Sequence, residues 1–187
     1  MASSFSVPTR EIPTLTTQRL TLRPYASADV EPLFRLLNEG DVLRYFPNPL
    51  PPPRDRVERI VNHILDHWQE QGFGWWAVER RSDTALMGWC GLTFLPETGE
   101  TEIAYLLGRA YWEQGFATEA ATASLRFGFE RLVLPRIIGL VHPDNRGSQH
   151  VLEKLGMAFV DRASYFGMEL LRYWRDRESW LPADAQS

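Results

Sequence analysis

The sequence predicts one mixed domain, of the α/β or α+β class, in which helices pack on a largely antiparallel sheet. Three observations predict this class. Short apolar or alternating segments typical of strands recur along the chain. Segments with the 3.6-residue period of amphipathic helices interrupt them. In the second half the order strand, helix, strand, helix falls between groups of consecutive strands, so a β–α–β–α unit interrupts the sheet.

The first strand and the first helix are expected within residues 18–40. In residues 18–24 leucines alternate with polar residues, as in a half-buried strand, and a proline closes the segment. Ser27 then offers an N-cap to the first helix, and Gly40 is expected to end it.

Residues 41–53 are expected to form a stiff loop, because five prolines there forbid regular structure. Tyr45 and Phe46 lie in this loop. They could wall a substrate pocket, or they could pack the loop against the core, which is the commoner role of such aromatic residues.

A second amphipathic helix is expected over residues 57–68. It carries His63 and His67, which lie four residues apart. We interpret these two histidines as a solvated flank of the helix and not as a zinc site, because no third ligand is evident nearby.

Two antiparallel strands are expected over residues 75–79 and 85–94, followed by a turn over residues 96–99. Gly88 and Gly91 interrupt the second of these strands. Glycine inside a strand predicts a bulge or a close approach of another backbone.

Residues 101–121 form the central stretch of the sequence and are interpreted as a strand, a short loop and a helix. The continuous apolar run at 103–107 is typical of a strand buried on both faces. Gly115 precedes a helix expected over residues 115–131, whose first backbone N–H groups lack intrahelical acceptors. These donors, a glycine that permits close approach and the Thr118 hydroxyl suit a phosphate group. The alternative is an ordinary connection in which the glycine only makes a turn.

The rest of the chain completes the sheet. A buried strand over 136–141 is followed by a loop over 142–145 and by a final helix that Gly156 ends. A closing pair of strands is expected over 157–160 and 166–174.

Composition limits the class of protein. The 187 residues suit a single domain with its own core, and 12% aromatic residues exclude disorder. Cys90 is the one cysteine, which permits no internal disulfide and fits a reducing cytoplasm. No signal peptide or apolar membrane span is evident. The net charge of −4, with no basic stripe, argues against nucleic acid as the main ligand.

We expect residues 1–14 to be a flexible segment, residues 15–180 to be the single domain, and residues 181–187 to be a tail. A homodimer is compatible with the sequence, which specifies no oligomeric state.

Two segments carry a resemblance to a known family. They are Y-W-E-Q-G-F-A-T-E-A in the central stretch and N-R-G-S-Q-H-V-L-E-K-L-G-M after the later buried strand. In this order, with these elements around them, they resemble the GNAT acetyltransferase superfamily over roughly residues 14–175. The opening L-T-T-Q-R-L-T-L-R-P and the proline-rich loop are similar to its ribosomal-protein N-terminal acetyltransferase (Rim) branch.

The resemblance implies a GNAT-like fold with helices on both faces of the sheet. It also implies an acetyl-coenzyme A site and no metal, with the pantetheine arm between two splayed parallel strands, residues 102–107 and 136–141. Asn145 matches the family asparagine that meets the pantetheine arm; its alternative role is to cap the last helix, and both roles could hold at once. Trp112 departs from the family pattern, which often has Arg or Gln there. The implied cofactor-binding residues are Tyr105, Leu106, Leu107, Glu113, Gln114, Gly115, Phe116, Ala117, Thr118, Asn145 and Ser148.

The resemblance implies direct attack of an amine on the thioester. An amine is mostly protonated at neutral pH, so a base must take its proton. Glu102 matches a family glutamate in that role; its alternative is a solvated carboxylate at the start of a strand. The N–H of Leu106 or Leu107 would stabilise charge on the carbonyl oxygen.

The acid that would protonate the leaving thiolate is less clear from the sequence. Leu152 stands where many family members have a tyrosine. Ser148, His150, Tyr165 and Tyr173 are unranked substitutes, and Ser148 also matches a position close to the cofactor.

The expected function is therefore an N-acetyltransferase that moves an acetyl group from acetyl-CoA to a primary amine, either a protein N-terminus or a small molecule. Tyr45, Phe46, Trp75 and Trp89 are the candidate acceptor-binding residues. The alternative is a non-catalytic domain that binds or senses acyl-CoA. A P-loop nucleotide enzyme is disfavoured, because no G-K-[ST] follows the glycine.

Overall fold

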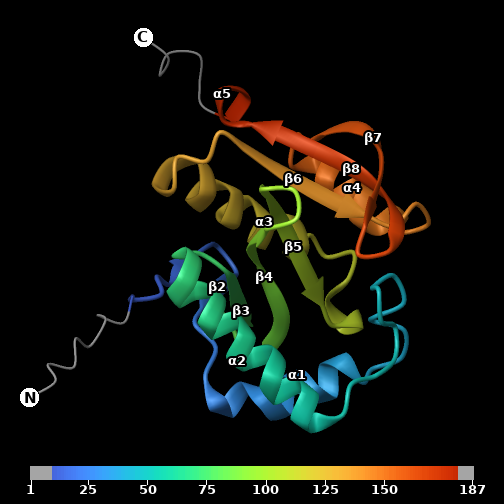
Figure 1. The fold of residues 1–187 in the computed structure, drawn as a ribbon. Coiled ribbons are helices and arrows are strands. Elements are labelled where there is room, and N and C mark those ends of the chain that lie inside the picture. The colour runs from blue at the N-terminus through green and yellow to red at the C-terminus, as the bar shows by residue number, and fades with distance from the viewer. Residues whose placement is uncertain (1–9, 181–187) are drawn as a thin grey trace, which may run out of the picture.

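The computed structural model describes residues 10–180; the expectations for residues 1–9 and 181–187 lie outside this range. Across the described residues the chain forms one eight-stranded sheet in the order β1-β2-β3-β4-β5-β6-β8-β7 (Figure 1). The elements are β1 (Leu15–Thr16), β2 (Leu20–Arg23), α1 (Val30–Leu37), α2 (Arg54–Gln71), β3 (Trp75–Arg80), β4 (Leu86–Leu95), β5 (Glu100–Leu107), α3 (Phe116–Arg126), β6 (Arg136–Val141), α4 (Arg146–Lys154), β7 (Ala158–Tyr165), β8 (Met168–Asp176) and α5 (Arg177–Trp180).

The predicted fold class is confirmed. Neighbouring strands pair antiparallel except for β5 and β6, which are parallel. In the described residues this parallel pair has a single point of register, Glu102 opposite Ile138. The two strands therefore diverge beyond Glu102 and leave an opening inside the sheet.

Helices or loops cover both faces of the sheet, as two neighbouring residues of β4 show. Consecutive residues of a strand project to opposite faces. Cys90 of β4 packs on Ser124 of α3, with 3.4 Å between sulfur and hydroxyl oxygen. Its neighbour Trp89 packs against Phe46, which belongs to the loop between α1 and α2. Helix α4 lies on the α3 side, where Leu152 covers Gly139 of β6.

The start of the first helix differs from the prediction. A 3₁₀ turn over Ser27–Asp29 precedes α1, and its N-cap is Ala26, so the prediction of Ser27 as the cap is wrong. The Asp29 carboxylate organises this corner instead, because it accepts hydrogen bonds from the Ala26 N–H and from the Arg23 guanidinium. Helix α1 also ends at Leu37, before Gly40.

Helix α2 is longer than its apolar period predicts. Pro53 is its N-cap, and Gly72 ends it in the left-handed conformation with φ +77°. The interpretation of His67 as a solvated residue is wrong, while His63 is exposed as expected. His67 Nδ1 lies 2.8 Å from the Phe73 carbonyl oxygen, so this ring joins α2 to the chain that follows it.

The two strand glycines do mark close approaches. A Cβ atom at Gly88 would lie 2.0 Å from the Leu106 carbonyl oxygen, and one at Gly91 would lie 2.1 Å from the Gly74 carbonyl oxygen. The register between β3 and β4 also shifts after Val78, opposite Gly88. Glycine is required at both places because any side chain would strike a neighbouring backbone.

The C-terminal hairpin is longer than predicted. Strand β7 continues to Tyr165, although residues 161–165 were expected to connect two shorter strands. The chain then turns at Phe166 and Gly167, both with positive φ. The strand lies at the edge of the sheet and is largely exposed, so its polar residues hide the apolar alternation that marks a strand.

Two further findings complete the fold. Pro13 accepts a 2.7 Å hydrogen bond from the Trp76 indole, so the described part of the N-terminal segment has a fixed partner. No helix between residues 10 and 180 combines the length and the apolar character needed to span a bilayer.

Candidate functional site

A cleft of about 640 Å³ opens where β5 and β6 diverge. The end of β5, the starts of α3 and α4 and the loop after α1 form its walls. Among the predicted cofactor-binding residues, Tyr105, Leu106, Leu107, Glu113, Gly115, Phe116, Ala117, Thr118, Asn145 and Ser148 line it. Gln114 does not line it, because its side-chain amide turns back to the Ala110 carbonyl oxygen, 2.8 Å away.

The start of α3 presents free backbone donors to this cleft. Gly115 is the N-cap, with φ +79° and no side-chain cap. The first intrahelical bond runs from the Glu119 N–H to the Gly115 carbonyl, 3.0 Å, so the N–H groups of residues 116–118 precede the ladder. Glu113 also has a left-handed φ of +59°, which curls the loop into a concave set of N–H groups. Such a helix start fits a pyrophosphate.

Arg19 supports this loop from outside the cleft, a role that the sequence did not reveal. Its guanidinium lies 4.2 Å from the centre of the Phe116 ring and donates to the Gln114 carbonyl oxygen at 3.0 Å. It also binds Glu119 at 2.6 Å, which neutralises a carboxylate in the first turn of α3. Arg19 belongs to the opening L-T-T-Q-R-L-T-L-R-P segment, but its contact with Glu119 spans a hundred residues, so no local pattern reveals this role.

The start of α4 brings a hydroxyl pair to the cleft. Asn145 Oδ1 accepts a hydrogen bond from the Ser148 N–H at 3.1 Å, so Asn145 does cap the helix. Ser148 Oγ lies 2.8 Å from the Tyr105 hydroxyl, which also lies 3.1 Å from the Ser148 carbonyl oxygen. Burial raises the pKa of Tyr105, so the phenol stays protonated and can donate.

Glu102 lies on the other side of the opening. It is three residues from Tyr105 on β5, so the two side chains project from opposite faces. Burial raises the pKa of Glu102 to about 8, and the main chain of Leu140 acts to lower it. Because Leu140 belongs to β6, the partly buried carboxyl lies near the main chain of that strand. Glu102 does not itself line the cleft.

Of the four predicted acceptor-binding side chains, Tyr45 and Phe46 line the cleft, whereas Trp75 and Trp89 do not. Trp75 and Trp89 stack with ring centroids 5.4 Å apart and planes 4° apart. Phe46 meets Trp89 edge-on at 6.3 Å, and Tyr45 stacks on His142, beyond the end of β6, at 5.2 Å. The loop after α1 therefore contacts both sides of the opening.

The other predicted side chains have different partners. His150 lines the cleft but is exposed and lies 3.1 Å from Glu153. Tyr165 donates to Glu100 and Tyr173 packs on Phe159, and neither lines the cleft. Leu152, which stands where many family members have a tyrosine, is buried against Gly139 of β6.

Trp112 and Cys90 are held in place by the fold. The Trp112 indole N–H donates to the Leu107 carbonyl oxygen at 2.7 Å, which ties the loop to β5 and occupies that acceptor.

Burial raises the pKa of Cys90 to about 12, so its thiol stays neutral. Within residues 10–180 no three His, Cys, Asp or Glu side chains are grouped to hold a metal ion.

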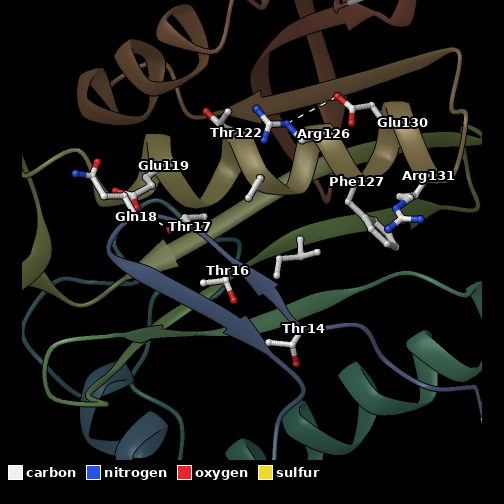
Figure 2. A pocket seen from close by; sticks show the side chains of 12 residues that line it. Thr14, Thr16, Thr17, Gln18, Glu119, Thr122, Arg126, Phe127, Glu130 and Arg131 are labelled. Carbon is white, nitrogen blue, oxygen red and sulfur yellow. Dashed lines mark hydrogen bonds and ion pairs between the residues drawn. The ribbon is translucent and has the colours of Figure 1, made fainter.

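A second hollow, of about 630 Å³, lies between β1 and α3 (Figure 2). Threonines of residues 14–17 face charged side chains along the helix, where Arg126 pairs with Glu130. None of the predicted site residues lines this hollow. This hollow therefore takes no part in the predicted site.

Comparisons with known proteins point to one family. Residues 19–158 match the model of the acetyltransferase (GNAT) domain. The chain is 33% identical over 148 residues to the uncharacterized N-acetyltransferase p20 of Bacillus licheniformis, covering 76% of this chain and 80% of that protein. It resembles the acetyltransferase structure from Agrobacterium tumefaciens strain C58 with TM-score 0.78 and 30% identity, covering 89% and 95% of the two chains. The putative ribosomal-protein-serine acetyltransferase from Vibrio cholerae shares the fold at TM-score 0.74 and 24% identity, covering 87% and 97%.

Proposed function

The chain belongs to the acetyltransferase (GNAT) family, whose members transfer an acetyl group from acetyl-CoA, and from this premise we propose that it acetylates a primary amine by direct attack on the thioester. The observation that carries the proposal is the position of Glu102. Its carboxyl lies near the main chain of β6 beside the parallel pair, with a pKa raised to about 8, while the Tyr105–Ser148 hydroxyl pair lies on the opposite face. A base and a hydrogen-bond donor thus flank one opening.

Acetyl-CoA supplies the activated acetyl group. The free N–H groups of residues 116–118 and the left-handed turn at Gly115 would hold its pyrophosphate, and Arg19 would brace that loop. Asn145 and the end of β5 would receive the pantetheine arm, as amide and backbone groups can both donate and accept.

Glu102 would take the proton from the incoming amine, directly or through water, so that the nitrogen lone pair attacks the carbonyl carbon. The Leu106 or Leu107 N–H would stabilise the developing oxyanion. As the carbon–sulfur bond breaks, Ser148 would donate a hydrogen bond to the leaving sulfur. Its hydroxyl would in turn accept one from Tyr105. A thiol of pKa about 8.5 is a fair leaving group, so this modest assistance is enough.

The acceptor is a primary amine, either a protein N-terminus or a small molecule, with Tyr45, Phe46, Trp75 and Trp89 around it. The opening motif and the proline-rich loop lean toward the ribosomal-protein branch. The Vibrio cholerae structure, at 24% identity, shows only that the fold is shared. The lone buried Cys90 suits a reducing compartment such as the cytoplasm.

A non-catalytic acyl-CoA sensor, the alternative reading of the sequence, has no support from the family match. It would also leave the position of Glu102 unexplained, because a binding domain needs no buried carboxyl at the gap, where burial disfavours its charged form.

The decisive experiment is a thiol-release assay with acetyl-CoA against primary amines and N-terminal peptides, comparing the wild type with Glu102→Gln. We expect the variant to lose about 10²- to 10⁴-fold in kcat, the usual contribution of a general base, with acetyl-CoA affinity within about twofold. Glu97→Gln, on the exposed turn after β4, is the matched control and should keep wild-type turnover. Absence of thiol release with every acceptor would overturn the proposal.

A further inference from the structure

A row of cationic side chains lies along one wall of the cleft. Arg146, His150 and Lys154 of α4 all line it. They follow one another at intervals of four residues, so they stand on the same face of the helix over about 12 Å of its length. All three are exposed, so a ligand can reach them from solvent. We call these three residues the cationic row.

The acidic residues of the cleft belong to its other walls. Asp41 lies in the loop after α1, where Arg109 pairs with it at 3.1 Å. Glu113 lies in the loop before α3, and Asp144 lies in the loop before α4. No residue that lines the cleft from within α4 itself is acidic. The wall that this helix forms is therefore positively charged.

Two members of the cationic row have no carboxylate partner among residues 10–180. His150 Nδ1 lies 3.1 Å from a Glu153 carboxylate oxygen. Arg146 donates to the neutral amide of Gln149, with 3.1 Å between Nη1 and Oε1. Lys154 has no hydrogen-bond or ion-pair partner in this part of the chain. The charges of Arg146 and Lys154 are therefore available to an anionic ligand.

The end of α4 does not account for Lys154. A lysine in the last turn of a helix can bond to the final carbonyl groups, which lack intrahelical donors. Here Arg175 of β8 donates to the Leu155 carbonyl oxygen, and Lys154 lines the cleft instead. Its ammonium group is a compact charge on a flexible stem, which suits a phosphate at the edge of a cleft.

We propose that Arg146 and Lys154 bind the 3′-phosphate of coenzyme A and so select the acyl donor. The inference rests on the proposed function and names the donor specificity of the same site. The 3′-phosphate is a terminal monoester, and such a group carries a charge of about −1.5 to −2 at pH 7. Charge-assisted hydrogen bonds from cationic side chains match it better than neutral donors do. An acetyl thioester that lacks this phosphate binds the cleft more weakly.

The two helices divide the donor between them. The free N–H groups of residues 116–118 at the start of α3 suit the pyrophosphate. Ser148, which would assist the leaving sulfur, stands in the first turn of α4, and Lys154 stands about 9 Å further along the helix axis. The reactive end of the donor and its terminal phosphate are therefore held at different levels of one helix.

Calorimetry with coenzyme A and 3′-dephospho-coenzyme A tests the proposal, because the two ligands differ in this phosphate alone. We expect the wild type to bind coenzyme A about tenfold more tightly or better, the size of one charge-assisted contact. Lys154→Met and Arg146→Met should each lower this ratio by about threefold or more, while affinity for the dephospho ligand stays within about twofold. Lys154→Arg should keep the ratio. Arg56→Met, on an exposed position of α2, is the control for the loss of one positive charge and should match the wild type.

Two further measurements use the same comparison. The ratio of kcat/KM for acetyl-CoA and acetyl-3′-dephospho-CoA should follow the binding ratio, because the phosphate lies away from the reacting atoms. The ratio should also fall as ionic strength rises, since salt screens exposed charges.

The outcomes separate this inference from the proposed function. Equal affinity of the wild type for the two ligands overturns the inference and leaves the proposed function standing. Equal weakening of both ligands by Lys154→Met also overturns it, because the row would then act on the pyrophosphate. If neither ligand binds the wild type, the proposed function fails and the inference fails with it.

Discussion

At the scale of single residues, burial shifts the pKa of two side chains that the proposed reaction uses. Glu102 and Tyr105 stand on one strand, and the desolvation of each raises its pKa. For the tyrosine this preserves a donor at neutral pH. For the glutamate it produces a carboxyl that exchanges its proton near pH 8, where a base for an amine is useful. The strand alternation then sends them to opposite faces of the opening.

The raised pKa of Glu102 predicts a specific dependence of stability on pH. Below the ordinary value of 4.5 the carboxyl is protonated both folded and unfolded. Between 4.5 and about 8 the folded protein keeps a proton that the unfolded chain has released, so rising pH lowers the free energy of unfolding. Glu102→Gln lacks this loss. Its free energy of unfolding relative to the wild type, measured in urea, should increase from pH 5 to pH 8.5. A difference that does not vary with pH contradicts this account.

At the scale of elements, the start of α3 shows how a local backbone conformation prepares a binding surface. The left-handed residues Glu113 and Gly115 curl the loop before the helix. Arg19 holds the loop from behind through the Gln114 carbonyl and the Phe116 ring. The donors of the first turn are therefore fixed in place, and we expect this to lower the entropy cost of binding the proposed pyrophosphate.

We expect Gly115→Ala to raise the KM for acetyl-CoA by about tenfold or more, equivalent to about 1.4 kcal/mol. An alanine strains the φ of +79° and turns the donors of residues 116–118 away from the anion. Gly99→Ala is a close control, because Gly99 has φ +71° with open space around it on the turn before β5. Both variants should lose about 1 kcal/mol of stability, but only the first should weaken acetyl-CoA binding. Equal KM values would remove the pyrophosphate role from this loop.

At the scale of the whole molecule, a polar network ties the C-terminal hairpin to the centre of the sheet. Arg172 of β8 bonds Asp161 of β7 through two hydrogen bonds, at 2.7 and 3.0 Å, and reaches Glu100 at the start of β5, 3.1 Å away. Tyr165 also donates to Glu100. Because β5 and β6 share a single point of register in the described residues, this network helps to hold the two halves of the sheet together around the opening.

Arg172→Met should lower the free energy of unfolding by about 1–3 kcal/mol, because it leaves two partly buried carboxylates without their cation. Arg162→Met, in the same hairpin, removes an exposed pair with Glu169 and should cost less than about 0.5 kcal/mol. Chemical denaturation of both variants measures the difference. Similar losses would show that the network contributes no more than a surface ion pair.

Most elements of the fold were predictable because their signals are local. The apolar runs of β5 and β6, the amphipathic period of α2 and the glycines of β4 each depend on a few neighbouring residues. The errors fall where a distant partner overrides the local signal. Ser27 is a good cap by type, but Asp29 and its bond to Arg23 decide the corner. The exposed edge strand β7 and the two-residue strand β1 owe their existence to the strands beside them.

The sequence by itself determined the fold class, the strand that carries Glu102 and the helix start proposed to bind the pyrophosphate, because periodicity, glycine conformation and helix polarity are properties of short segments. Only the tertiary structure decided that the Ser148 hydroxyl meets Tyr105, that Arg19 braces the loop before α3, and that burial raises the pKa of Glu102. Those features join residues up to a hundred positions apart, and they exist only once the packed sheet has excluded water and brought them into contact.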